Sequence, residues 1–246
     1  MTTGLSYNGS ITGTVSYLEQ VATLAVVPQT DPNFVAITPA MITYAENRIY
    51  RDLDFLSTVS SNTSYAATVG TRAVNIPASL FVTLQQINVI TPATATDPDL
   101  GTRNPLLPVT LEYMNAVWPS SASAGVPQWF AMFNQNTVLL GPFPDAAYTL
   151  ELVGTTRPDS LSSTNQTTFI SLYLPDLMIM ASMVYLSAYQ RNFSGAASND
   201  PNMPVTYESQ YQTLLKGATV EEARKKFQSS AWTSQSPAVV ASPGRG

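Results

Sequence analysis

Apolar residues recur at helical spacing in two segments, residues 38–57 and residues 205–227, which lie far apart along the chain. Each segment has an apolar stripe on one side only, so neither helix buries that stripe alone. The long stretch between them alternates short β-branched or aromatic runs with turns rich in Pro and Gly. We therefore expect the ends of the chain to pack together as helices around an inserted β-rich middle. The stripes are Ile42, Ala45, Ile49, Leu53 and Leu56 in the first segment, and Tyr207, Tyr211, Leu214 and Ala218 in the second.

Capping residues set the expected helix boundaries. Thr38 followed by Pro39 is typical of an N-cap and a first helical turn, which makes residues 29–37 a linker. A shorter helix is predicted over residues 14–27, where Pro28 ends it. Another begins near Ser171 and is apolar almost all round over residues 177–189, which predicts a central position. Gly217 leaves two possibilities for the last helix, a kink or one continuous helix.

The middle of the chain reads as strands separated by turns. Thr137–Leu140 and Tyr148–Val153 are predicted to pair as a hairpin around the turn at residues 141–145. Residues 91–108, with several prolines and charges, are predicted to be a long loop, a feature that is usually functional or mobile. The further predicted strands are Ala73–Ile76, Leu84–Ile90, Val109–Tyr113 and Gln128–Phe133.

These patterns predict an α+β protein: a helical bundle from N- and C-terminal helices, with an inserted antiparallel, sandwich-like β-rich domain. The expected organisation is an N-terminal extension with a short helix (1–37), a helical core (38–58 and 170–227), a β insertion (59–169) and an extended C-terminal tail (228–246). The tail is polar apart from Trp232, Val239 and Val240. It is therefore either frayed or ordered on a partner, with Trp232 as the anchor.

Composition narrows the possible functions. The formal net charge is −5, and charged residues make up only 11% of the 246 residues. A protein that grips nucleic acid needs clustered Lys and Arg, and the one basic run, Arg224 to Lys226, follows two glutamates. The longest apolar stretch, Leu172–Leu186, is shorter than the roughly 20 residues of a membrane span and contains a proline and an aspartate. We therefore expect that the protein neither binds nucleic acid tightly nor is anchored in a membrane.

No catalytic constellation emerges from the residue types. The chain contains no Cys and no His, so the commonest metal ligand and general base are missing. The lysines all lie on the last helix, and no phosphate loop or dinucleotide fingerprint is present. Asp97 and Asp99 are either a solvated turn or, less favourably, a Ca²⁺ site without the usual graded spacing. The sequence predicts no enzyme, no cofactor and no metal.

Charged residues concentrate on the two terminal helices, in mixed sign. They are either solvent-washed faces or contacts between like subunits, where mixed charges select register. The expected inter-subunit residues are Glu46, Arg48, Arg51, Asp52, Asp54 and Arg224. The alternative function is a carbohydrate- or receptor-binding β module, as in a tail, spike or adsorption protein, with stacking rings from Tyr113, Trp118, Trp129 and Phe130. These aromatic residues equally suit a β core.

Ordered motifs over residues 38–227 resemble the head-to-tail adaptor (connector or neck) proteins of short-tailed bacteriophages. They are the run from Ile42 to Leu53, Val74–Leu80, Pro127–Phe130, Thr137–Asp145 with Tyr148–Leu152, the apolar helix opened by Leu174–Leu177, and the closing Tyr-rich helix. Residues before position 38 and after Phe227 lie outside this resemblance.

The resemblance implies a structural virion protein that forms a ring, of about twelve copies, between the capsid portal and the tail. Its expected partners are copies of itself, the portal protein and a tail or nozzle protein, while genomic DNA passes through without specific binding. The implied localisation is the capsid–tail junction, after assembly in the host cytoplasm. Portal contacts are expected from Phe227, Trp232, Val239 and Val240, and tail contacts from Asp97, Asp99 and Arg103.

Overall fold

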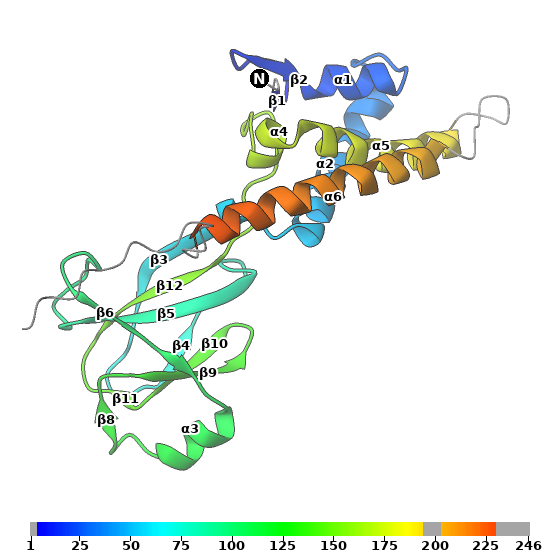
Figure 1. The fold of residues 1–246 in the computed structure, drawn as a ribbon. Helices are drawn as coiled ribbons and strands as arrows, with labels where there is room; N and C mark the ends of the chain where they lie inside the picture. Colours follow the sequence, from blue (N-terminus) through cyan, green and yellow to red (C-terminus); the bar gives the residue numbers. More distant parts are fainter. Residues whose placement is uncertain (1–3, 194–202, 230–246) are drawn as a thin grey trace, which may run out of the picture. The chain divides into compact units, whose positions relative to one another are not determined.

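The structure is a computed structural model that describes residues 4–193 and 203–229 (Figure 1). Two compact units divide the chain: residues up to Leu56 join those from Pro158 onward, and Ser57–Arg157 form the second unit. We call them the helical unit and the β unit. The short 3-10 helix η1 (Leu56–Thr58) lies where the chain passes from one to the other. The protein is thus of the α+β class, as predicted.

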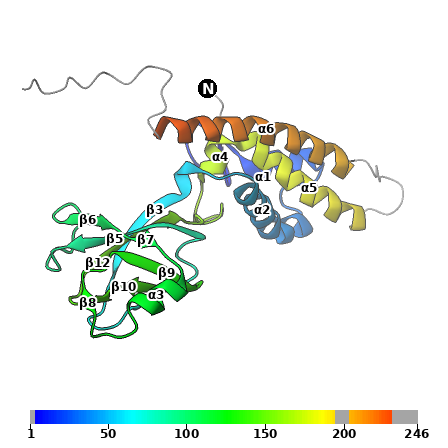
Figure 2. The ribbon, with the colours of Figure 1, turned by 60° about the horizontal axis from the view of Figure 1, so that its bottom comes forward.

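The helical unit is built around three long helices, and smaller elements lie beside them. Helices α5 (Pro175–Phe193) and α6 (Met203–Ser229) lie side by side, and α2 (Pro32–Asp52) packs on α5 (Figures 1 and 2). The smaller elements are β1 (Gly4–Ser6), β2 (Thr14–Ser16), α1 (Tyr17–Leu24) and α4 (Phe169–Tyr173). Strands β1 and β2 pair in parallel.

One hydrophobic core joins every helix of this unit that the structure describes. Its buried members include Tyr17 of α1, Met41 of α2, Ile170 of α4, Met178 of α5 and Tyr211 of α6. The Tyr17 hydroxyl is 2.7 Å from the Ser182 hydroxyl, so this buried polar group has a partner. Burial raises the pKa of Tyr17 well above its ordinary value. Helix α1 is therefore an integral part of the core.

Helix α2 begins at Asp31-Pro32, before the Thr38-Pro39 pair at which the sequence predicts its start. Asp31 is the N-cap and accepts hydrogen bonds from two backbone N–H groups, while Pro32 occupies the first turn. The predicted cap, Thr38, lies inside the helix, where its hydroxyl donates to the Phe34 carbonyl at 2.7 Å. Pro39 lacks the N–H that would bond the Val35 carbonyl, and this loss falls on the exposed side of the helix, where Val35 is 56% exposed. The expected linker over residues 29–37 and the expected start at Thr38 are therefore wrong.

Helix α6 is one continuous element through Gly217, which settles the two possibilities that the sequence left open. Its inner face buries Tyr211, Ala218 and Glu222, and its outer face exposes Val205, Val220 and Phe227. Apolar residues thus occupy both sides of α6. The contacts within the helical unit bury only one of these two sides.

The β unit contains two four-stranded sheets with a common core. The first has the order β3-β12-β5-β6 and is antiparallel throughout; the second has the order β4-β10-β9-β7. Buried side chains of both sheets, among them Val74, Ile87, Val138 and Leu150, belong to one hydrophobic cluster. The strands are β3 (Val59–Ala66), β4 (Ala73–Asn75), β5 (Thr83–Thr91), β6 (Thr102–Pro105), β7 (Leu107–Pro108), β8 (Ala124–Gly125), β9 (Trp129–Asn134), β10 (Thr137–Gly141), β11 (Phe143–Pro144) and β12 (Thr149–Thr155).

The predicted hairpin between residues 137–140 and 148–153 does not form. Strand β10 pairs with β9 and β4, whereas β12 lies in the other sheet between β3 and β5. The segment between β10 and β12 contains β11, which pairs in parallel with β8. Prolines 142 and 144 lack the N–H groups that a hairpin ladder needs. The segment therefore carries the chain from one sheet to the other.

Three further segments differ from the prediction. Of residues 109–113, expected as a strand, the last three begin α3 (Leu111–Val117), which Thr110 caps by accepting a hydrogen bond from the Tyr113 N–H at 3.3 Å. The predicted loop at 91–108 contains β6 and β7. Strand β3, rich in Ser and Asn, was not predicted, because its composition is typical of a loop.

Candidate interaction surfaces

The charged residues of α2 form a polar cluster with α6. Arg48 donates two hydrogen bonds to the Glu208 carboxylate, at 2.7 and 2.5 Å, and lies 3.8 Å from Asp52. Its guanidinium also lies over the Tyr211 ring, 4.1 Å from the centroid. The Arg48 hydrogen bonds hold the pKa of Glu208 below its usual range, and those same bonds raise the pKa of Arg48. The Arg48 cluster therefore ties α2 to α6 within one chain.

Two more predicted inter-subunit residues also pair inside the helical unit. The Tyr211 hydroxyl donates to Asp52 at 2.7 Å, and Lys226 pairs with Asp54. Burial, followed by the hydrogen bond to Asp52, raises the pKa of Tyr211. These contacts account for Asp52 and Asp54 without a second copy. The sequence showed the mixed charges but not that their partners lie on the same chain.

Glu46 lies in the interior, only 2% exposed. Its Oε1 accepts a hydrogen bond from the Leu161 N–H at 3.0 Å, which fastens the segment before α4 onto α2. Its Oε2 has no geometric hydrogen-bond partner among the described residues. Burial raises the pKa of this carboxyl above its ordinary value. Glu46 thus acts inside the helical unit.

Arg51 and Arg224 differ from the rest of the predicted set. Both are exposed, and neither forms an ion pair with any residue that the structure describes. Arg51 borders a hollow of about 620 Å³ on the outer face of α2, together with Pro39, Ala40, Thr43, Tyr44, Asn47, Arg48 and Asp52. This hollow is the side of α2 that faces away from the unit's own core.

The predicted portal contacts fall at and beyond the end of α6. Phe227 is in the last turns of the helix and is 58% exposed. Trp232, Val239 and Val240 lie outside the described residues. The structure therefore places one of the four residues, on an exposed helical surface.

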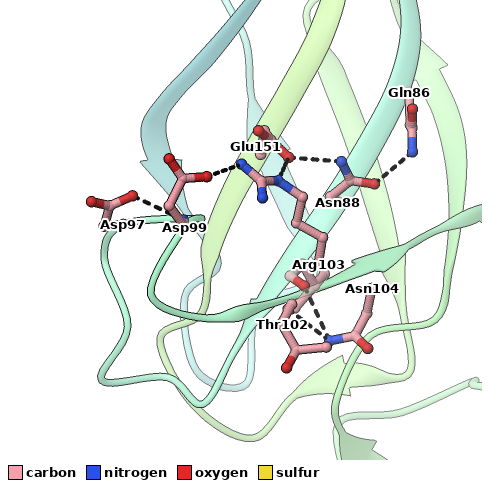
Figure 3. Close-up of polar contacts among 9 residues, drawn as sticks. Gln86, Asn88, Asp97, Asp99, Thr102, Arg103, Asn104 and Glu151 are labelled. Carbon is pink, nitrogen blue, oxygen red and sulfur yellow. Dashed lines mark hydrogen bonds and ion pairs between the residues drawn. The ribbon is translucent and has the colours of Figure 1, made fainter.

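Asp97, Asp99 and Arg103 come together on the β3-β12-β5-β6 sheet (Figure 3). Arg103 donates to Asp99 at 2.9 Å and, through Nε, to Glu151 at 3.0 Å. The hydrogen bonds to Asp99 and then Glu151 raise the pKa of Arg103. Asp97 accepts a hydrogen bond from the Asp99 N–H at 2.9 Å. The sequence missed Glu151, because its position on a strand facing Arg103 depends on sheet pairing.

Aromatic residues proposed for glycan stacking pack mainly against one another. The rings of Trp118 and Trp129 are 5.0 Å apart, and Tyr113 meets Trp118 edge-on at 6.1 Å. Trp118 also covers Gly141, where an added Cβ would lie 2.8 Å from the indole. Trp129 borders a hollow of about 530 Å³ with Leu107, Val126 and Pro127. The rings therefore hold α3 on the second sheet.

Two features of the described residues bear on other functions. Within residues 4–193 and 203–229, no helix combines the length and the apolar character that a membrane crossing requires. In the same residues, no three His, Cys, Asp or Glu side chains gather where they could hold a metal ion. The charged and apolar groups that the structure does bring to the surface are suited to protein contacts.

The chain matches the family described as SU10 adaptor protein over residues 16–240, and it belongs to this family of bacteriophage adaptor proteins. The predicted resemblance to phage head-to-tail adaptors is thus confirmed. The match begins at Ser16 and ends at Val240, so it includes α1 and part of the predicted tail. No curated protein matches the chain significantly.

Proposed function

We propose that the protein joins the capsid portal to the tail as a closed ring of about twelve copies, through which the genome passes. The observation that carries this proposal is membership of the adaptor family over residues 16–240, a family of structural phage proteins. The net charge of −5 supports the passage of DNA without adhesion, because phosphate binding needs clustered cations. The protein is a virion component, and we place it at the capsid–tail junction after assembly in the host cytoplasm.

The ring contacts are assigned to the helical unit. Among the predicted inter-subunit residues, Arg51 and Arg224 are exposed without an ion pair in the described residues, so they are available to carboxylates of a neighbouring copy. Arg48, Asp52 and Asp54 shape the same surface from within the chain. Exposed charges of this kind select partner and angle more than they add affinity.

The portal contact is assigned to the end of α6 and to residues 228–246. Phe227 supplies an exposed aromatic ring at the start of this region, and Trp232, Val239 and Val240 follow it in the sequence. Large aromatic side chains are frequent anchors of protein interfaces. The β unit is assigned to the tail protein, through the loop that carries Asp97 and Asp99.

Native mass spectrometry and negative-stain microscopy of the full chain, alone and mixed with the purified portal protein, test this function. The expected result is a ring on the portal, whether or not the adaptor forms a ring alone. A chain that stays monomeric and does not bind the portal would overturn the proposal. A truncation after Phe227 should keep its helical circular dichroism and lose portal binding, which separates docking from folding.

A further inference from the structure

The loop between β5 and β6 displays a leucine to solvent on an ordered support. Leu100 is 83% exposed, more than any other large apolar side chain that the structure describes in the β unit. It lies between Asp99 and Arg103 in the sequence, and Figure 3 shows the polar contacts of these two residues. A leucine in water contributes little to the stability of the unit that carries it. Leu100 is therefore free of a packing role within the unit and open to a partner surface.

The base of this loop is packed onto the sheet. An added Cβ on Gly101 would lie 2.5 Å from the Ile90 side chain and 3.0 Å from that of Ala95, and Ile90 is fully buried. The Ala95 N–H donates to the Pro92 carbonyl at 2.9 Å, and the Leu100 N–H donates to the Asp97 carbonyl at 3.1 Å. The backbone on both sides of Leu100 is thus held by contacts within the free chain.

A chain of polar contacts fastens the tip of the loop to two strands. Arg103 of β6 bridges the exposed Asp99 and the buried Glu151 of β12. Glu151 also accepts a hydrogen bond from Asn88 of β5 at 2.8 Å, and Asn88 accepts one from Gln86 at 2.8 Å. Since the loop is ordered before any partner arrives, association does not have to supply that ordering free energy.

The charge around Leu100 is negative. Asp97, Asp99 and Glu151 are three carboxylates, and Arg103 is the one cation that pairs with them among the described residues. Asp97 forms no ion pair within the described part of the chain, and the Asp99 side chain is 81% exposed. A surface with this charge repels anionic lipid headgroups, so a lipid surface is a poor occupant. An apolar pocket bordered by Lys or Arg is complementary to it.

We infer that residues 92–101 are a pre-ordered docking peg whose Leu100 enters an apolar, basic-rimmed pocket of the next tail protein. The inference rests on the proposed adaptor function and deepens its tail contact. Leu100 is the anchor, and Asp97 and Asp99 meet the basic rim. Arg103 and Glu151 are positioning residues that hold the peg against the sheet.

The test uses heads from cells infected with an adaptor-defective phage, the purified full-length adaptor, and an extract that contains the tail proteins. Adaptor bound to heads is measured by quantitative gel, tail addition by microscopy, and function by plaque count. Leu100→Ala should occupy heads as the wild type does and require roughly 10- to 100-fold more extract for equal tail addition. Val69→Ala, an exposed aliphatic residue of the same unit, is the matched control and should behave as the wild type.

The outcomes separate the inference from the function beneath it. If Leu100→Ala adds tails as well as Val69→Ala does, the peg is refuted and the adaptor function stands. If the wild-type adaptor does not bind heads at all, the adaptor function itself fails. Both variants change exposed side chains, so equal unfolding midpoints are expected and checked.

Two further variants test the positioning and the charge. Glu151→Gln keeps the shape of the side chain but loses the charge that holds Arg103, so amide exchange over residues 92–101 should accelerate and tail addition should weaken. Unchanged exchange in this variant would refute the fastening. The rate of tail addition should fall as NaCl rises, and less steeply for Asp97→Asn than for the wild type. Equal salt slopes would refute the basic rim.

Discussion

The Arg48 cluster predicts a measurable coupling between α2 and α6. The perturbation is Arg48→Met, which keeps a long apolar stem beside Tyr211 and removes the guanidinium. The side chains of Arg48 and Glu208 are 19% and 37% exposed, so solvent screens their attraction in part. A bidentate pair of this exposure is worth about 1 kcal/mol, and the cation–π contact with Tyr211 adds about 0.5–1 kcal/mol. We expect Arg48→Met to lower the free energy of unfolding of the helical unit by about 1.5–2 kcal/mol.

A double-mutant cycle with Glu208→Gln isolates the ion pair from the rest. Urea unfolding followed by circular dichroism at 222 nm reports the helical unit, where nearly all the described helices lie. In a Trp232→Phe background, which removes the chain's third tryptophan, fluorescence reports Trp118 and Trp129 of the β unit. The coupling free energy should be about 1 kcal/mol at low salt and should shrink in 1 M NaCl. The fluorescence midpoint should not move. A coupling below about 0.3 kcal/mol would refute the Arg48–Glu208 pair as a stabilising link between α2 and α6.

Four other substitutions give distinct expectations. Gly154→Ala places a Cβ 2.4 Å from the Thr83 carbonyl oxygen and should cost the β unit about 1–3 kcal/mol, whereas Gly217→Ala meets nothing within 4 Å and should stabilise the helical unit by up to about 1 kcal/mol. The raised pKa of Glu46 means that the unfolded state loses this proton first, so stability should fall as pH rises from 4.5 through the folded pKa; Glu46→Gln should flatten that decline. Arg51→Glu should leave the unfolding midpoint unchanged and prevent ring formation on the portal, because Arg51 has no ion pair among the described residues.

Each of these expectations has an outcome that contradicts it. Gly154→Ala should lower the unfolding midpoint measured by fluorescence, and Gly217→Ala should raise the one measured by circular dichroism. If both variants shift the midpoint of the same probe, the two units do not unfold separately. If the stability of Glu46→Gln depends on pH as steeply as that of the wild type, other titratable groups cause the pH dependence. Normal rings from Arg51→Glu would remove the α2 face from the subunit contact.

The helices were predictable from the sequence because the apolar stripe of each helix is the face that it buries. Ile42, Ala45 and Ile49 are each at most 2% exposed, as a core-facing stripe requires. The start of α2 was missed because Asp31-Pro32 and Thr38-Pro39 are equally good initiation signals. The choice between them depends on Phe34, which is buried in the core of the helical unit and so draws the preceding turn into the helix.

Strand partners were not predictable in the same way. Alternation identifies a strand and its buried face, but it does not identify the neighbour. Strands β10 and β12 both alternate and lie close in sequence, yet the prolines between them carry the chain to another sheet. For the same reason the sequence did not predict the contact of Glu151 with Arg103, which exists only because β12 and β6 flank β5.

The charges of α2 show how a surface for partners can be built from contacts within one chain. Arg48, Asp52 and Asp54 are each satisfied by residues of α6, which leaves Arg51 as the exposed cation between them. An interface charge is most selective when its position is fixed, because less side-chain and backbone freedom is lost on association. The internal pairs therefore do not compete with a role in assembly. By tying α2 to α6, they would fix the direction in which Arg51 meets a neighbouring copy in the proposed ring, as Arg103 and Glu151 would fix Leu100 for the proposed tail contact.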